Sequence, residues 1–276
     1  MKITLRSVLA LLLLLSTAFL RAQGPPPSPV VVVPDGRTET DSIPGNTSNV
    51  YLFSTLPGHS YSIEQSRGLN QPTVPMFVSA GCPGPFFGTP VNDTSSMDPA
   101  VTLNTGFGQQ RQREAFACTG PIYPAILPGQ ASIMIYNSSP TPYTFSITVT
   151  DTTLFSAKWG AGVNSDTFWT FTNTSSAPVN ISINALDTNG FAQFFPGLPP
   201  PGNSMSVAPG AVLSIDTTQI PPQFRTNPPG GAPLGGSVRV TEDGPPGAIL
   251  ATAAIVTNAA SPTPTTESVK IAPKHQ

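Results

Sequence analysis

Alternation of apolar and polar residues with a period of two is the main pattern along this chain. Between residues 143 and 150, aromatic or β-branched residues alternate with threonine and serine. Residues 167–172 and 179–185 follow the same pattern. This period is typical of β-strands that bury one face and expose the other. No long amphipathic helical pattern follows the amino terminus, so the sequence predicts an all-β fold.

Turn residues recur between these short runs, which favours sandwiches of many short strands. We expect two tandem antiparallel β-sandwich domains, jelly-roll or immunoglobulin-like, at residues 30–151 and 152–258. Within them we expect a buried strand at Val30–Val33 and a hairpin that joins residues 133–137 to residues 143–150. We also expect residues 235–242 and 248–257 to form a closing pair. The Ser/Thr/Pro-rich tail, 259–276, is predicted to be disordered.

The amino terminus predicts a secretory signal peptide at residues 1–22. Lys2 and Arg6 precede an apolar run of 13 residues, Val8 to Leu20, and Ala22 offers a cleavage site. An uncleaved membrane anchor is the alternative. A Pro-rich spacer, residues 23–29, follows, and no later stretch is apolar enough to span a membrane. The sequence therefore predicts a secreted, periplasmic or cell-surface protein.

Charged residues make up only 9% of the chain, against roughly 25% in an average soluble protein. Removal of residues 1–22 would leave nine basic and 14 acidic residues. Because the basic residues are not clustered, nucleic acid and anionic lipid are poor partners.

The opening of the first unit combines Ser42-Ile43, Tyr51-Leu52-Phe53 and the run Pro57-Gly58-His59-Ser60-Tyr61-Ser62-Ile63. With the alternating runs at 133–137 and 143–150, these motifs resemble bacterial pre-peptidase C-terminal domains. The resemblance covers about half of residues 38–151. It implies an accessory jelly-roll-like module of secreted bacterial proteins, sometimes linked to binding or secretion. A long Gly/Pro-rich central region and a cysteine pair depart from that family.

The second unit resembles uncharacterised exported bacterial β-sandwich proteins. The shared features are Trp159-Gly160, Phe168-Trp169-Thr170, an Asn-Thr-Ser-Ser-x-Pro turn from Asn173, Pro209-Gly210, and Gly236-Ser237-Val238-Arg239-Val240. This second resemblance implies architecture and no established activity.

The two cysteines, Cys82 and Cys118, are predicted to form a disulfide because an even pair in an exported chain normally does. The bond would close a loop of about 36 residues. A redox or metal pair is the alternative, but the spacing lacks the close CxxC pattern.

Catalytic and metal-binding patterns are sparse. His59 lies in a Pro-Gly turn and is expected to be exposed, and no second histidine accompanies it at zinc-ligand spacing. Acidic residues are few and scattered over turns and strand ends, so a glycosidase-type carboxylate pair has little support. Asp187-x-Asn189-Gly190 resembles the start of a calcium loop but also fits an Asx turn. We expect no cofactor, no metal and no enzyme activity.

Tryptophan offers one candidate ligand contact. Trp169 lies in an alternating strand and is expected to pack between two sheets. Trp159 precedes a Gly-rich stretch and is expected to be exposed in a loop, where it could contact a sugar. The sequence thus predicts a secreted, non-enzymatic structural, adhesive or interaction protein of the bacterial exterior. A carbohydrate-binding accessory protein is the alternative, and a carboxylate-based hydrolase is a third reading. The candidate partners are polysaccharide and another cell-surface protein.

Overall fold

The computed structural model of the chain consists of β-strands, and no helix occurs in the part that it describes. That part comprises residues 29–67, 74–79, 81–82, 101–104, 110–118, 128–162, 164–188, 204–218, 226–227, 232–257 and 262–273. It therefore holds no helix long and apolar enough to cross a membrane. The predicted signal peptide and most of the spacer lie outside the described residues.

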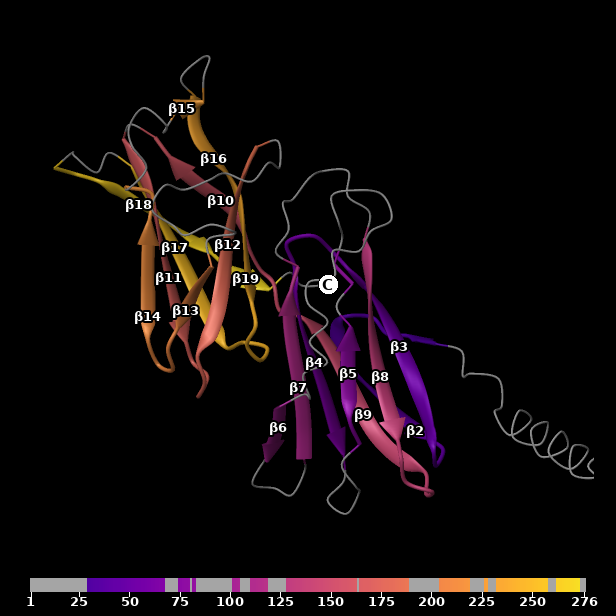
Figure 1. The fold of residues 1–276 in the computed structure, drawn as a ribbon. Coiled ribbons are helices and arrows are strands. Elements are labelled where there is room, and N and C mark those ends of the chain that lie inside the picture. The colour runs from indigo at the N-terminus through magenta and orange to yellow at the C-terminus, as the bar shows by residue number, and fades with distance from the viewer. Residues whose placement is uncertain are drawn as a thin grey trace, which may run out of the picture.

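The first sandwich packs a four-stranded sheet, in the order β1-β3-β8-β5, on a five-stranded sheet, in the order β2-β9-β4-β7-β6 (Figure 1). Its core is rich in aromatic and β-branched side chains from both sheets. The strands are β1 (Val30–Val31), β2 (Asp35–Ile43), β3 (Thr47–Thr55), β4 (Ser60–Arg67), β5 (Met76–Ser79), β6 (Val101–Asn104), β7 (Gln110–Ala117), β8 (Gly129–Asn137) and β9 (Tyr143–Asp151).

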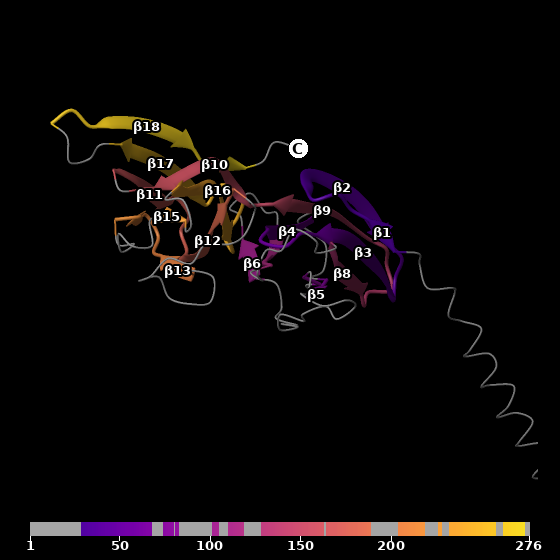
Figure 2. The ribbon, with the colours of Figure 1, turned by 90° about the horizontal axis from the view of Figure 1, so that it is seen from above.

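The second sandwich packs the sheet β13-β12-β16-β10-β19, with β15 paired to β16, on the sheet β14-β11-β17-β18. Trp159 and Trp169 lie in its core with ring centroids 6.4 Å apart. The strands are β10 (Leu154–Ala161), β11 (Ser165–Asn173), β12 (Val179–Asp187), β13 (Ser204–Val207), β14 (Val212–Asp216), β15 (Thr226–Asn227), β16 (Ala232–Glu242), β17 (Ile249–Thr257), β18 (Thr265–Lys270) and β19 (Ala272–Pro273). Figure 2 shows the two sandwiches side by side. The chain is therefore all-β, with several antiparallel sheets packed in sandwiches.

Several tight turns join strands of opposite sheets. The turns after β3, β8, β11 and β16 each carry the chain across the sandwich. The predicted hairpin of residues 133–137 with 143–150 is therefore wrong, because β8 pairs with β3 and β5 while β9 pairs with β2 and β4. The predicted pair of residues 235–242 with 248–257 is wrong for the same reason. Each strand alternates as expected, but its partner lies elsewhere in the sequence.

Two buried asparagines hold the corresponding turn of each sandwich. The Asn137 Nδ2 donates to the carbonyl oxygens of Ile43, Pro44 and Thr141, and its Oδ1 accepts from the Ser139 amide. Asn173 ends β11 and donates in the same way to Ala177 and Val207. Both are fully buried. Their amides satisfy backbone groups that the sheets leave unpaired where the chain changes sheet.

The amino-terminal strand differs from expectation. Val30–Val31 forms a parallel pair with β3, and Val31 is 77% exposed. Only Val32 of the Val30–Val33 run is buried. The predicted buried strand is thus a short, exposed edge strand.

The carboxyl-terminal tail is ordered over residues 262–273, so its predicted disorder is wrong there. β18 pairs with β17 over six residues, and β19 pairs with β10. Between these two strands Ile271 enters the core of the second sandwich and is 6% exposed. Anchoring by one apolar side chain and a strand pairing outweighs the polar composition of the tail.

We predict that Ile271→Ala lowers the free energy of unfolding by about 2–4 kcal/mol, because it removes a buried side chain from the core. Urea denaturation monitored by tryptophan fluorescence measures the change. Lys270→Ala, at the exposed neighbouring position, is the control and is expected to have little effect. Equal stabilities of the two variants would show that the tail does not pack on the sandwich.

Candidate functional site: the junction between the sandwiches

The two sandwiches follow each other with almost no linker. β9 ends at Asp151 and β10 begins at Leu154. Thr152 and Thr153, between them, are both buried. The contact between the sandwiches brings β16 of the second against β4 and β7 of the first. Because of this contact, Ser60 and Ser62 on the outer face of β4 are buried, where outward positions normally meet solvent.

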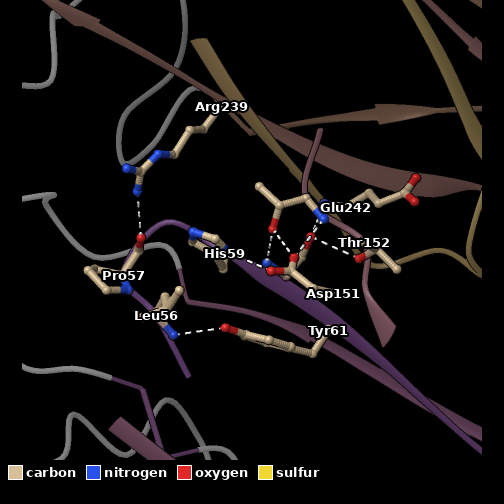
Figure 3. A network of polar contacts seen from close by, with 10 residues as sticks. Leu56, Pro57, His59, Tyr61, Asp151, Thr152, Arg239 and Glu242 are labelled. Carbon is tan, nitrogen blue, oxygen red and sulfur yellow. Dashed lines mark hydrogen bonds and ion pairs between the residues drawn. The ribbon is translucent and has the colours of Figure 1, made fainter. Parts of the chain in front are cut away.

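The Asp151 carboxylate organises the crossing point (Figure 3). Its Oδ2 lies 2.7 Å from the His59 Nδ1. Its Oδ1 accepts from the Thr153 amide at 3.0 Å and from the Thr153 hydroxyl at 2.5 Å. The Thr153 Oγ1 in turn accepts from the Ser60 amide. One carboxylate thereby fixes both the turn before β4 and the two residues that enter the second sandwich.

Ser60 carries the bonds from the first sandwich to the second. Its Oγ accepts from the Thr152 hydroxyl at 2.9 Å and from the Glu242 amide at 3.0 Å. Its carbonyl accepts from the Thr152 amide at 2.9 Å. Since Glu242 ends β16, this hydroxyl ties a strand end of the second sandwich directly to β4.

Arg239 provides a second link between the sandwiches. Its Nη1 donates to the Pro57 carbonyl at 3.0 Å, and its guanidinium lies 5.9 Å from the centroid of the Phe155 ring. The Phe155 ring also packs against His59, with centroids 5.3 Å apart. Burial lowers the pKa of Arg239, while the Asp151 charge opposes this shift.

Glu242 is a buried acid beside this network. Its side chain is on the same face of β16 as Val238 and Val240, which are in the core of the second sandwich. Neither carboxyl oxygen has a hydrogen-bond partner at normal distance and angle among the described residues. Burial raises the pKa of Glu242 to about 8; the Ile249 amide and the Arg113 charge oppose the shift, and the Asp243 charge adds to it. Glu242 is therefore largely protonated at neutral pH.

A histidine whose Nδ1 meets a carboxylate is also the orienting part of a catalytic triad. Here the pair is closed off. His59 is 5% exposed and lies between the rings of Tyr61 and Phe155, and Ser60 Oγ already accepts two hydrogen bonds. Among the described residues no group of three or more His, Cys, Asp or Glu side chains could hold a metal ion. The arrangement therefore joins the two sandwiches, and His59 and Ser60 are covered within it.

The residues predicted from sequence lie elsewhere. Cys82 and Cys118 form the disulfide, with Cα atoms 5.3 Å apart. Trp159 is in strand β10 and not in a loop; it is 2% exposed, and its Nε1 donates to the Leu186 carbonyl at 2.8 Å. The expected exposure of Trp159 is therefore wrong, because a register shift in the β10–β16 pairing between Ser156 and Trp159 places the indole in the core. Asp187 ends β12, while Asn189 and Gly190 lie outside the described residues.

Sequence reasoning missed the junction. His59 was expected to be exposed, and this is wrong because the second sandwich covers it. One sequence feature does point to a polar junction: Asp151, Thr152 and Thr153 follow one another at the predicted domain boundary. Nothing in the sequence pairs them with Ser60 or Glu242, which are about 90 residues away on either side.

No protein-family model and no curated protein sequence matches this chain. Among solved structures, the chain is similar to the pre-peptidase C-terminal domain of collagenase from Bacillus anthracis, with 12% identity and a TM-score of 0.31. That match covers 46% of this chain and 99% of the other. The full extracellular region of zebrafish Gpr126/Adgrg6 matches with 8% identity and a TM-score of 0.23, over 89% of this chain and 33% of the other. At these scores neither likeness indicates a function.

The raised pKa of Glu242 makes stability depend on pH. The unfolded carboxyl titrates near 4.5 and the folded one near 8, so folding takes up a proton between these values and stability falls as pH rises through them. We predict that Glu242→Gln flattens this dependence. At pH 8 the variant should be more stable than the wild type, by on the order of 3 kcal/mol, and near pH 4 the two should differ little.

Urea denaturation at a series of pH values measures this effect. Glu267→Gln, at a half-exposed site that pairs with Lys158, is the control and should keep the wild-type pH profile. If Glu242→Gln kept the wild-type dependence of stability on pH, Glu242 could not be the group responsible for that dependence.

Proposed function

We propose that the protein is an exported, non-catalytic structural or interaction protein of the bacterial exterior, in which both sandwiches act as one unit. The observation that carries the proposal is the closed junction. The groups best suited to chemistry, His59 and Asp151, are bonded to each other, and their side chains are only 6% and 10% exposed. The disulfide between Cys82 and Cys118 fits an oxidising compartment outside the cytoplasm. The motif resemblance to pre-peptidase C-terminal domains also favours an accessory role outside the cell.

We predict that protein purified from the culture medium or cell envelope of an expressing bacterium shows no turnover of ester, glycoside, peptide or phosphoester substrates. The reason is that the side chains of His59 and Asp151 are only 6% and 10% exposed, which leaves little of either group for a substrate to reach. Chromogenic substrate panels measure this, with His59→Asn as the matched variant. Turnover by the wild type that is lost in His59→Asn would overturn the non-catalytic proposal.

A carbohydrate-binding accessory role is the second candidate, and one outer face favours it. The outward side chains of β3, β8 and β5 include no charged residue. Tyr136 and Met134 on β8 are 43% and 40% exposed there, and Phe77 pairs with Met134 across the sheet. A neutral face with an exposed aromatic ring and a serine and glutamine rim suits a neutral polysaccharide. Trp159, the original candidate contact, is buried and does not support this role.

If this second role is correct, Tyr136→Ala should weaken binding to the recognised polysaccharide about ten-fold, because an exposed aromatic anchor is lost. Affinity electrophoresis in gels that contain neutral polysaccharides measures the change. Phe168→Ala removes a comparably exposed ring from the second sandwich and should leave binding unchanged. Equal retardation of wild type and Tyr136→Ala on every polysaccharide would exclude this face.

A further inference from the structure

The turn Leu56–His59, which leads into Ser60 and β4, contacts the second sandwich through Pro57 and His59. The Pro57 carbonyl accepts from Arg239 at 3.0 Å. His59 lies against the Phe155 ring and 2.7 Å from Asp151. Figure 3 shows the Pro57–Arg239 and His59–Asp151 contacts. The position of this turn therefore sets the position of the junction.

Hydrogen bonds fix this turn to the two segments that the disulfide joins. At its start, the Thr55 Oγ1 donates to the Gly81 carbonyl at 2.6 Å, and Gly81 directly precedes Cys82. At its end, the Gly58 amide donates to the Cys118 carbonyl at 2.8 Å, and the Cys118 amide donates to the His59 carbonyl at 2.7 Å. Both ends of the turn thus bond to the two segments that the disulfide joins.

The Cys82 segment is itself seated tightly on β8. A Cβ atom at Gly81 would lie 1.8 Å from the Gln130 carbonyl oxygen, and one at Gly129 would lie 2.1 Å from the Gly81 oxygen. The two backbones approach as closely as glycine allows. The disulfide therefore connects a fixed point in one sheet to Cys118 at the end of β7 in the other, and Cys118 holds the turn.

We propose that the Cys82–Cys118 disulfide is energetically coupled to the junction between the two sandwiches through the turn Leu56–His59, so that its reduction loosens the junction. In that step a dithiol reductant gives up two electrons and two protons. The Sγ–Sγ bond breaks, two cysteine thiols form, and the reductant closes into a cyclic disulfide. Cys118, which bonds to the end of the turn at Gly58 and His59, is then no longer tied covalently to Cys82.

Energetic coupling between two sites is reciprocal. A looser junction must therefore make the disulfide easier to reduce. Both cysteines are buried, with Cys82 at 7% and Cys118 at 1% exposure, so a thiolate reaches the sulfur atoms only when the region opens locally. Any change that frees the turn increases the population of that open form.

The test is the rate of disulfide reduction by dithiothreitol in native buffer, followed by alkylation and intact mass. Arg239→Ala removes the bond to the Pro57 carbonyl, 182 residues away in the sequence, and should speed reduction about five-fold or more. Ile255→Val, a mild change in the core of the second sandwich that takes no part in the junction, is the matched control and should reduce at the wild-type rate. Equal rates in the wild type and in both variants would overturn the proposal.

The converse arm uses hydrogen exchange in the double variant Cys82→Ser, Cys118→Ser. The Glu242 amide, which donates to Ser60 across the junction, should exchange several-fold faster than in the oxidised wild type. Amides of β11, in the far sheet of the second sandwich, should keep their protection. Unchanged exchange at Glu242 would count against the coupling, and the reduction-rate arm remains decisive if the double variant fails to fold.

Discussion

The Asp151 carboxylate at the end of β9, which is only 10% exposed, is the constraint on which the two-domain arrangement depends. Asp151 must be paired because an unpaired charge in this position would be very costly, and its partners come from the turn before β4 and from the two residues that begin the second sandwich. Domains of one chain usually move relative to each other unless their interface is large and apolar. Here the linker is two buried threonines whose polar groups are bonded to β4. A hinge motion at this point would have to break several buried hydrogen bonds together. Hydrogen bonds therefore hold the junction rigid, although its described residues form no large apolar contact.

Crossing between sheets is the second organising feature. Because the turns after β3, β8, β11 and β16 each carry the chain to the opposite sheet, each sandwich is held by pairings between strands far apart in sequence. Such turns leave backbone carbonyls unpaired inside the fold, and Asn137 and Asn173 supply the missing donors. The same arrangement occurs in both sandwiches: in each, a buried asparagine donates to backbone carbonyls and accepts from the amide of a serine two residues later.

The all-β class and the Cys82–Cys118 bond could be predicted from the sequence, because period-two alternation and a cysteine pair are local signals. Strand partners could not, since alternation fixes which face is buried and not which strand lies alongside. β7 was missed over most of its length because its sequence, QRQREAFA, is polar, although its pairing with β4 and β6 places it inside a sheet. The burial of Trp159 depends on a register shift that no local pattern reveals. The junction could not be predicted for the same reason as the strand partners, because Ser60, Asp151 and Glu242 come together only in the tertiary fold.

Charge is distributed unevenly in a chain that has little of it. His59, Asp151, Arg239 and Glu242 gather at the junction, while the outer face of β2 and β9 carries threonine and serine hydroxyls bonded in rows, such as Thr38 to Thr148 at 2.9 Å. The outward positions of β3, β8 and β5 carry no charge. Arg239 bonds to the Pro57 carbonyl across the junction, so a misaligned arrangement would leave this partly buried charge without its partner. The junction thereby favours the observed orientation, and any contact made by the uncharged outward positions of β3, β8 and β5 would depend on shape and hydrogen bonding and only weakly on salt.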